Sequence, residues 1–457
     1  MDIVRINEKD NVGVNLNTGH KVALRDIQKG EDVIKYGYPI GVATEDIKID
    51  DSVHSHNMKT KLGDILSYEY QPNFTPLVPK EPFYINAFVR ENGDIGIRND
   101  IWIIPTVGCV NSVAKTLSEK TGAIAFSHPY GCSQLGDDMT VTQLILRGLI
   151  SHPNKGGVLV LGLGCENNNI PEMKKILGIV NENRVKFLSV QDCKDEIAEG
   201  IRLIDELKEY SAKDIRQSVP VSRLKIGLKC GGSDGYSGIT ANAVCGKVTD
   251  EICAMGGTCV LTEVPEMFGA ETVLFDRCIN KEVFHKSVKL INDFKQYFKN
   301  HNQPVSENPS PGNKEGGITT LEEKSLGCVQ KGGTAPVVDV LDYGDIATKQ
   351  GLNILNGPGN DIVSITNLTA AGCHLILFTK GRGTPLGAPV PTIKIASNDE
   401  IANKKSHWTD FSAFGLDKNK KATELLDLIK KVCDGEETKN EILGNREIAI
   451  FKDGVTL

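Results

Sequence analysis

Hydrophobic and polar residues alternate with a short period in the first part of the chain. Residues 12–16, 21–24 and 33–36 each alternate apolar and polar positions, and glycines lie between these stretches. A period of two is typical of half-buried strands, and glycine permits the tight turns that short strands need. The pattern therefore predicts a small all-β domain over residues 1–67.

The pattern changes after a linker. Residues 68–82, YEYQPNFTPLVPKEP, contain four prolines and no helical periodicity, which predicts an extended linker. Beyond it, continuous apolar runs alternate with helix-compatible stretches, as where IWIIPTVG precedes VNSVAKTLSEK. Such runs are typical of buried parallel strands, so we predict an α/β body. A boundary near residue 220 divides this body into domains over residues 83–220 and 221–457.

Composition narrows the class of protein. The chain has 457 residues, of which 40% are hydrophobic and 24% charged, and a net charge of −7 without a basic cluster, so we do not expect it to bind nucleic acid. It has no apolar run long enough to cross a bilayer, and the N-terminal MDIVRINEKD lacks an apolar signal core. We expect a cytoplasmic protein that does not contact membranes, and chains of this size often form homo-oligomers.

Four of the twelve cysteines follow apolar runs and lie beside glycine or at a glycine-rich turn: Cys109, Cys132, Cys165 and Cys230. If each run is a parallel strand, the four thiols lie at carboxyl ends of strands, where α/β sheets bind ligands. Small buried residues in tight turns would give the same pattern, because free cysteine is often buried. The remaining cysteines read as packing residues, with Cys328 and Cys373, each preceded by glycine, intermediate. Polar candidates accompany the four thiols, namely His128, Ser133, Asp137, Asp138, Glu166, Lys229, Ser233 and Asp234.

Histidines concentrate in the N-terminal module. His54 and His56 in VHSHN are two residues apart, so on a strand they would share a face, and Gly19-His20-Lys21 brings a third imidazole. Neutral imidazoles bind Fe²⁺, Mn²⁺ or Zn²⁺. Ordinary surface histidines are the alternative interpretation.

A glycine-rich basic loop, Lys380-Gly381-Arg382-Gly383-Thr384-Pro385, follows the apolar run HLILF. Arginine binds carboxylates through two hydrogen bonds, although a turn with solvated charges has the same composition. NPSPGNKEGG, with Asn313 and Lys314, is a similar polar loop within the long loop expected over residues 301–317. Glu263 and Glu266 are further strand-end carboxylates, either catalytic or merely at the start of a helix.

Taken in order, the strings GHKVALRDIQKGEDVIKYGYPIG, VHSHN, NGDIGIRN, HPYGC, LGLGCE, KCGGSDGYSGITAN, NPSPGNKEGG and TKGRGTPLG resemble the altronate/galactarate dehydratase family. The resemblance runs from about residue 10 to beyond residue 395. It implies an N-terminal SAF-type β-clip domain, which some relatives carry as a separate subunit, and a two-part catalytic body. It also implies a divalent metal, Fe²⁺ with Mn²⁺ as the alternative, and removal of water from a small sugar acid.

D-altronate is the expected substrate, because VHSHN is similar to the altronate branch. Galactarate dehydration and sulfolactate-type elimination remain alternatives within the family, and an iron–sulfur redox protein or a non-catalytic carbohydrate-binding protein are alternatives outside it. Our hypothesis assigns the metal to His20, His54 and His56, with Cys109, Cys132, Cys165 and Cys230 as the competing placement. It assigns acid–base chemistry to His128, Glu166, Lys229 and Asp234. It assigns substrate binding to Lys380, Arg382, Thr384, Ser233, Asn313 and Lys314.

Overall fold

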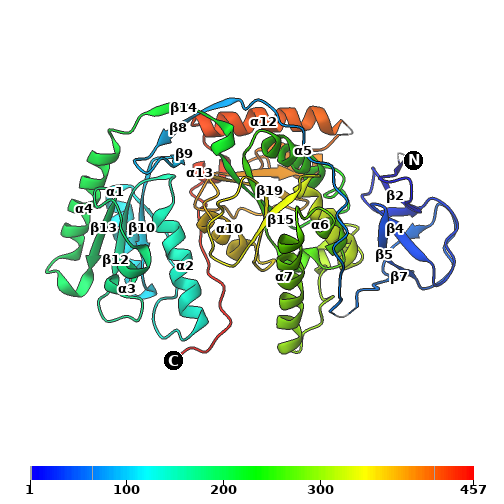
Figure 1. The fold of residues 1–457 in the computed structure, drawn as a ribbon, viewed down its shortest axis with the longest axis horizontal. Coiled ribbons are helices and arrows are strands. Elements are labelled where there is room, and N and C mark those ends of the chain that lie inside the picture. Colours follow the sequence, from blue (N-terminus) through cyan, green and yellow to red (C-terminus); the bar gives the residue numbers. More distant parts are fainter. Residues whose placement is uncertain (1–2, 64, 416) are drawn as a thin grey trace.

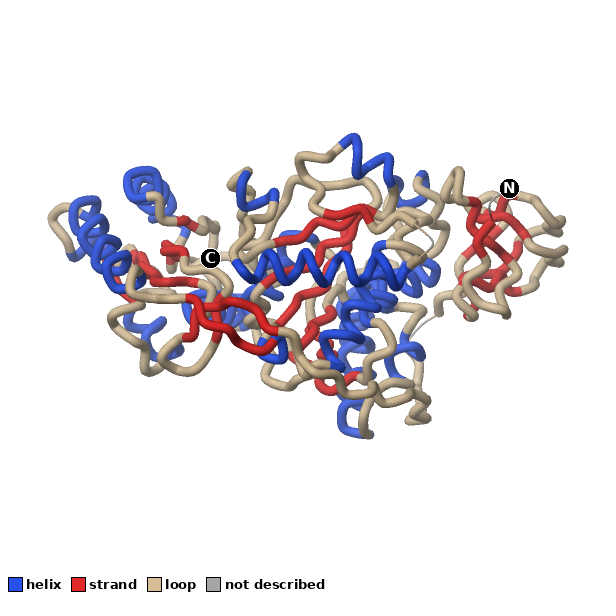
Figure 2. Tube along the Cα trace, turned by 90° about the horizontal axis from the view of Figure 1, so that it is seen from above, coloured by secondary structure: helices blue, strands red, loops and turns tan. Residues whose placement is uncertain are grey.

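The computed structural model describes residues 3–63, 65–415 and 417–457, and it has a small β module beside a larger α/β body (Figure 1). Residues 1, 2, 64 and 416, which fall within the predicted domain ranges, lie outside the described residues. Figure 2 shows the N-terminal module as strands and loops. The predicted fold class, an all-β N-terminal domain followed by an α/β body, is confirmed.

The N-terminal module consists of two small antiparallel sheets. The first contains, in spatial order, β1 (Ile3–Val4), β2 (Val12–Asn15), β3 (Lys21–Ala23) and β6 (Ser52–Val53). The second contains β4 (Asp32–Lys35), β5 (Tyr38–Ala43) and β7 (Met58–Lys59). Gly19, Gly30 and Gly37 have positive φ at the turns between these strands. Glycine adopts this conformation without steric cost, which explains the glycine spacing of the sequence.

Residues 65–83 form no helix or strand and lie along the C-terminal domain. The Tyr70 hydroxyl donates to the Cys278 carbonyl at 3.1 Å, and the Asn73 amide donates to the Asp276 carbonyl at 2.7 Å. Lys80 pairs with Glu251 at 2.6 Å. The segment is therefore a fixed strap on the surface of the body.

Strands at the two ends of the second domain pair with each other. They form an antiparallel sheet in the order β14 (Arg216–Pro220), β8 (Tyr84–Val89) and β9 (Ile95–Gly96). The apolar runs noted in the sequence do not include these short strands, which carry polar residues between apolar ones. The pairing brings the entry and the exit of the second domain together.

The second domain is a parallel sheet between two layers of helices. Its spatial order is β11 (Ile124–Ala125), β10 (Asp100–Pro105), β12 (Lys155–Gly162) and β13 (Val185–Ser189). Helices α1 (Asn111–Thr121) and α4 (Glu196–Ser211) cover one face, and α2 (Asp137–Ser151) and α3 (Ile170–Leu177) cover the other. Ile101 and Ile103 pack with α1 and α4, whereas Trp102 and Ile104 pack with α2. Burial of both faces explains why the run IWIIP is continuously apolar.

The third domain contains a seven-stranded parallel sheet. Its spatial order is β17 (Val337–Leu341), β18 (Gly351–Leu355), β16 (Thr258–Leu261), β15 (Lys225–Gly231), β19 (Leu375–Lys380), β20 (Thr392–Ala396) and β21 (Phe411–Ser412). Strand β15 comes first in the chain but lies between β16 and β19. The direction of winding reverses there, so a crevice opens at the carboxyl ends of these strands.

Helices surround this sheet on both faces (Figure 1). They are α5 (Ala241–Ala254), α6 (Glu271–Phe275), α7 (Lys281–Asn300), α8 (Pro311–Glu315), α9 (Leu321–Cys328), α10 (Asp361–Ala370), α11 (Asp399–Lys404), α12 (Lys418–Asp434) and α13 (Lys439–Ile442). Helix α10 packs on α2, so the second and third domains share one apolar core. No helix in the described part of the chain is both long enough and apolar enough to cross a membrane.

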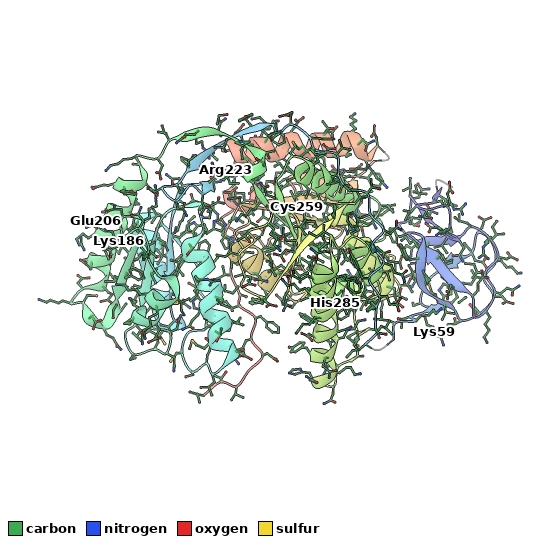
Figure 3. All side chains as sticks on the ribbon, in the orientation of Figure 1. Lys59, Lys186, Glu206, Arg223, Cys259 and His285 are labelled. Atoms are coloured by element: carbon green, nitrogen blue, oxygen red, sulfur yellow. The ribbon has the colours of Figure 1, made fainter. Side chains whose placement is uncertain are left out.

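Side chains differ between the interior and the outer edges of the body (Figure 3). Cys259 is fully buried on β16, within the core of the third domain. Lys186 and Glu206 lie at the outer edge of the second domain and pair at 3.1 Å. Exposed pairs of this kind contribute little to stability, so the fold depends on the shared core.

The N-terminal module docks on α9 through buried charges. The Lys21 ammonium donates to Glu323 at 2.8 Å and also to the Gly317 carbonyl and the Thr319 hydroxyl, each at 2.8 Å. Lys35 donates to the other Glu323 oxygen at 2.8 Å. Burial opposes ionisation of Glu323, but the two ammonium groups lower its pKa to about 2. One carboxylate thus holds two lysines of the module.

Close backbone approach also requires glycine at this interface. A Cβ atom on Gly235, in the loop after β15, would lie 1.9 Å from the Gly19 carbonyl oxygen of the module. The Tyr236 hydroxyl donates to the Leu16 carbonyl at 3.0 Å. The module therefore contacts the loop at the carboxyl end of β15 directly.

Candidate active site

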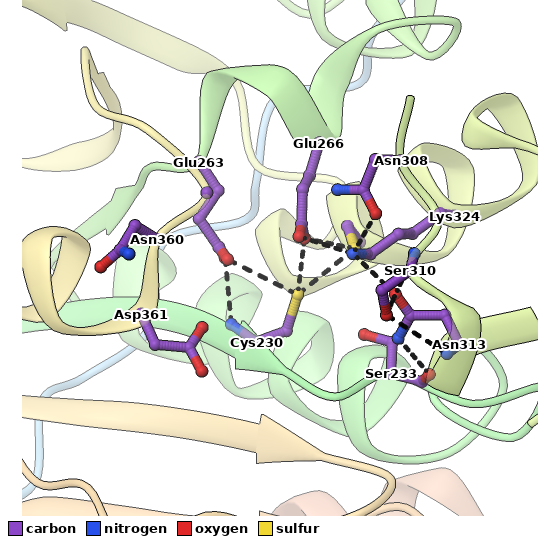
Figure 4. A network of polar contacts seen from close by, with 12 residues as sticks. Cys230, Ser233, Glu263, Glu266, Asn308, Ser310, Asn313, Lys324, Asn360 and Asp361 are labelled. Atoms are coloured by element: carbon purple, nitrogen blue, oxygen red, sulfur yellow. Dashed lines mark hydrogen bonds and ion pairs between the residues drawn. The ribbon is translucent and has the colours of Figure 1, made fainter. Parts of the chain in front are cut away.

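Strand β15 ends beside a buried carboxylate and a second thiol. The thiols of Cys230 and Cys328 each donate to Glu266 Oε2 at 3.0 Å, and their sulfur atoms lie 3.3 Å apart (Figure 4). Cys328 ends α9, and Glu266 lies in a short 3₁₀ turn after β16. Among the described residues, this is the one group of three or more histidine, cysteine or carboxylate side chains with ligand atoms all within 4.8 Å of one another.

Lysines balance the carboxylates around these thiols. Lys324 pairs with Glu266 at 2.9 Å, and Lys331 pairs with Glu263 at 3.2 Å. Lys229 pairs with Glu263 and, at 2.8 Å, with Asp361. All of these side chains except Asp361 are buried. Buried charges are tolerated only when they are paired, so the cluster is a closed ionic network.

The network determines the protonation of its members. Burial opposes ionisation of Glu266, yet Lys324 and Lys229 hold its pKa far below the ordinary value. The hydrogen bond with Cys230 and then burial raise the pKa of the Cys328 thiol well above its ordinary value. Burial opposes the charge of Lys229, but Glu263 raises its pKa, so this lysine stays protonated. In this geometry Lys229 is a paired cation, and its acid–base assignment stays a prediction.

The loop after β15 is fixed by Asp234. Its carboxylate accepts hydrogen bonds from the Ser237 hydroxyl at 2.7 Å, the Ser397 hydroxyl at 2.9 Å and the Asn398 amide at 2.8 Å. Burial raises the pKa of Asp234, and these donors oppose the rise. Asp234 thus joins β15 to β20 through both of its oxygens, and its catalytic assignment stays a prediction.

Helix α8 links this loop to the ionic network. The Asn313 side chain donates to the Ser233 carbonyl at 2.8 Å and accepts from Lys324 at 3.3 Å. Asn313 and Ser310 form a capping box at the start of α8, which explains why a proline- and glycine-rich segment becomes helical here. The expected loop over residues 301–317 is thus helical over α8, and Lys314 is exposed on it.

The basic loop after β19 contains three residues predicted to bind the substrate, and their side chains have different surroundings. Arg382 pairs with Glu315 at 2.7 Å and, with Asp234, lines an open cavity of about 560 Å³. Lys380 is buried instead beneath the Trp408 carbonyl, 3.4 Å away, and burial lowers its pKa to about 7. The Thr384 carbonyl accepts from Lys394 at 3.1 Å. Of the three, Arg382 is the residue that lines the cavity.

Two of the three predicted metal-binding imidazoles lie together. The rings of His20 and His54 have centroids 5.7 Å apart. His54 Nε2 is 2.9 Å from the Lys314 carbonyl, and its Nδ1 accepts the Ser55 amide at 2.7 Å, so both ring nitrogens have partners. His54 and His56 lie in the turn between β6 and β7, so the prediction that a strand presents them on one face is wrong. Asn57 causes the turn, because its side chain accepts the His54 amide at 3.0 Å.

His128 and Glu166 lie in the second domain and support its loops. His128 is buried, its Nε2 donates to the Pro105 carbonyl at 2.8 Å, and its Nδ1 accepts the Tyr130 amide at 3.2 Å. Burial lowers the pKa of His128 to about 4, so the ring is neutral. Glu166 accepts the Thr106 hydroxyl at 2.7 Å and the Leu163 amide at 2.9 Å. Both side chains have the contacts of loop anchors, and their catalytic assignment stays a prediction.

Parts of the buried network have little signal in the sequence. Cys328 is marked only by the glycine before it, Glu266 is one of two strand-end carboxylates, and Lys324 lies in an ordinary run of charged residues. Spacing offered a weak signal for Glu266, which follows strand β16 by five residues. It offered none for Lys324, because Glu322, Glu323 and Lys324 read as a solvated helix although all three are buried.

A polar crevice at the carboxyl edge of a parallel sheet, completed by a docked β module, defines an α/β enzyme with an N-terminal SAF-type domain. A binding protein built on the module alone would not need the ionic network of the body. The chain belongs to the altronate/galactarate dehydratase family, as its motifs predicted. The enzyme is therefore a hydro-lyase.

Three family descriptions match consecutive parts of the chain. The altronate/galactarate dehydratase SAF domain matches residues 14–61. The second domain of D-galactarate dehydratase/altronate hydrolase matches residues 87–212, and the C-terminal domain of D-galactarate/altronate dehydratase matches residues 221–456.

Curated relatives cover almost the same length. Altronate dehydratase of Bacillus subtilis is 51% identical over 99% of this chain and 94% of its own. Altronate dehydratase of Escherichia coli is 51% identical over 96% of this chain and 92% of its own. Galactarate dehydratase (L-threo-forming) of Escherichia coli is 32% identical over 86% of this chain and 80% of its own.

Proposed function

We propose that this enzyme removes water from D-altronate and releases 2-dehydro-3-deoxy-D-gluconate, acting in the cytoplasm. The observation that carries the proposal is 51% identity to two altronate dehydratases over nearly the whole chain. The galactarate dehydratase is 32% identical, which favours altronate over galactarate.

The reaction needs three kinds of group. A cation must neutralise the substrate carboxylate, a base must take the C2 proton, and an acid must protonate the departing C3 hydroxyl. Arg382 on the cavity and the exposed Lys314 on α8 suit the carboxylate, since guanidinium binds it through two hydrogen bonds. Ser233 and Asn313 are joined to each other, so they would shape the pocket around the hydroxyls.

A divalent metal, when bound, would stabilise the negative charge that develops on the carboxylate side of the substrate. Cys230, Glu266 and Cys328 would hold it, because their donor atoms lie together and thiolates suit Fe²⁺. The two thiols would have to lose their protons, so binding should strengthen as pH rises. Mn²⁺ is the less suitable ion for this donor set, since it prefers oxygen ligands.

The imidazole placement of the metal competes with this donor set and is tested separately. Replacing His54 and His56 together by alanine should leave bound iron unchanged if the thiol site holds it. Loss of the iron in that variant, measured by metal analysis, would favour the imidazoles instead.

His20 is the best-supported acid–base residue. Its side chain is half-buried beside the ring of His54, which contacts α8, and within the described part of the chain the His20 ring nitrogens have no hydrogen bond. Asp234, Lys229, Glu166 and His128 are each held by several partners in this geometry. An imidazole is also the commonest general base in enzymes.

Replacing His20 by asparagine is expected to lower kcat by about 10²–10³-fold, as loss of a general base does. The variant should keep its thermal stability, because the ring makes no hydrogen bond in the described part of the chain. The matched control is His56→Asn, an exposed imidazole of the same module, which should keep its kcat. Equal kcat of the two variants in steady-state assays would contradict an acid–base role of His20.

The experiment that tests the function measures 2-keto-3-deoxy acid formation from a panel of sugar acids. Enzyme purified anaerobically is assayed with added Fe²⁺, with Mn²⁺ and with chelator. We expect turnover of D-altronate that chelator abolishes and Fe²⁺ restores. Turnover of galactarate alone would show that galactarate, not altronate, is the substrate. Turnover unaffected by chelator would contradict the proposed need for a metal.

A further inference from the structure

Three cysteines meet at one edge of the second domain. Cys109 follows β10, Cys132 follows β11 and Cys165 follows β12. These strands are neighbours in the order β11-β10-β12 and run parallel, so the loops that carry the cysteines leave the sheet at the same edge. All three thiols are exposed, in contrast to Cys230, which is 2% exposed in the third domain.

Backbone hydrogen bonds hold the three loops against one another. The amide of Gly108, beside Cys109, donates to the Tyr130 carbonyl at 2.9 Å. The carbonyl of Gly131, beside Cys132, accepts the Asn168 amide at 3.1 Å, which joins this loop to the one that carries Cys165. A Cβ atom on Gly131 would lie 2.0 Å from the Thr106 carbonyl oxygen, so only glycine permits this approach. The thiols are therefore presented on a fixed frame.

Hydrogen-bond donors accompany the thiols. Gln191 Nε2 donates to the Cys165 sulfur at 3.4 Å. Gln134, two residues after Cys132, is 4% exposed, and its Nε2 has no partner among the described residues. A buried donor without a partner is costly unless a ligand accepts its hydrogen. Ser133 has a φ of 57°, and strained backbone of this kind concentrates at functional sites.

The spacing of the three sulfur atoms excludes a single ion in this geometry. They are not all within 4.8 Å of one another, whereas thiolates around one Zn²⁺ at about 2.3 Å lie about 3.8 Å apart. A cluster of several irons and sulfides bridges a wider gap, and its sulfides accept hydrogen bonds of the kind that Gln134 offers.

We propose that Cys109, Cys132 and Cys165 hold an iron–sulfur cluster. Each thiol releases its proton to the solvent and forms one sulfur–iron bond, while ferrous iron, ferric iron and inorganic sulfide supply the rest of the cluster. In a four-iron cluster, three thiolates leave one iron without a protein ligand. That iron is open to water or to an oxygen ligand. The inference goes beyond the proposed function and does not depend on the substrate.

The test uses the full chain, reconstituted anaerobically with ferrous and ferric iron and sulfide. We expect about four acid-labile sulfides per chain, about four irons in addition to any iron held at the site on β15, and broad visible absorbance. Cys109→Ser, Cys132→Ser and Cys165→Ser should each lower the absorbance and the sulfide at least about fivefold. The matched control is Cys193→Ser in the same domain, whose half-buried thiol donates to the Ser189 carbonyl at 3.3 Å and should be dispensable.

Absence of acid-labile sulfide from the reconstituted wild type would overturn the proposal, as would full sulfide in the triple variant. Iron that persists without sulfide, and disappears in Cys230→Ser, would belong to the site on β15 instead. Alkylation of the wild type gives a measurement that needs no variant. The cluster should protect the three cysteines from iodoacetamide, as read by mass spectrometry, and rapid labelling of all three in the reconstituted protein would contradict it.

Discussion

Replacing Glu323 by alanine is expected to lower the free energy of unfolding by about 3–5 kcal/mol, the usual cost of removing one partner of a buried ion pair. The carboxylate holds Lys21 and Lys35, whose side chains are 0% and 1% exposed. Without it, two buried ammonium groups of the module lose their shared anionic partner. The module should therefore leave the body, and kcat should fall with it. Denaturant unfolding measures the loss of stability. Faster proteolysis within residues 65–83 reports that the module has left the body, and a steady-state assay measures kcat.

Glu45→Ala, an exposed carboxylate of the same module, is the matched control and should change neither stability nor proteolysis. The effect of Glu323 should also depend on pH. Because its pKa falls from 4.5 to about 2 on folding, its contribution is complete above pH 4.5 and is lost as the pH falls toward 2. The difference between wild type and variant should shrink over that range. A difference that grew with acid would contradict this account of docking.

Replacing Glu266 by alanine is expected to lower kcat at least about 100-fold and to release the metal, as loss of a metal ligand does. Glu266 accepts hydrogen bonds from both thiols and pairs with Lys324, so it lies at the centre of the site in Figure 4. Its loss removes one of the three proposed metal ligands and leaves the buried Lys324 ammonium without its ion pair. Metal analysis and steady-state assays on the folded fraction separate these two consequences.

Glu271→Ala supplies a matched control for Glu266. Glu271 pairs with Lys295 at 2.7 Å, and both side chains are buried, but neither belongs to the thiol group. This variant should lose comparable stability while keeping its metal and its kcat per folded molecule. If both variants lost metal and activity equally, Glu266 would have only a structural role.

Much of the fold could be predicted from local patterns. Period-two alternation marked the N-terminal strands, and runs such as IWIIP marked parallel strands with both faces covered. The positions of Cys109, Cys132, Cys165 and Cys230 after such runs correctly indicated carboxyl ends of strands. These features depend on residues near one another in the chain, so the sequence displays them.

Features that depend on distant partners could not be predicted. Helix α9 contains Glu322, Glu323 and Lys324, which look like a solvated face, yet the lysines of the module and Glu266 bury them. Similarly, His128 and Asp234 have residue types suited to catalysis, and only the structure shows the hydrogen bonds by which they also anchor loops. Composition gives the chemistry of a side chain, whereas its partners determine which part of that chemistry is used.

The ion pair between Lys21 and Glu323 joins residues 302 positions apart in the chain. A ribosome therefore releases the module long before it synthesises the helix that receives it, and domains generally fold as units during synthesis. Until then the module is a tethered ligand whose effective concentration depends on the intervening chain. Closure of the crevice by the module is thus a late event of biosynthesis, so a polypeptide released before α9 would carry a folded module with nothing to dock against.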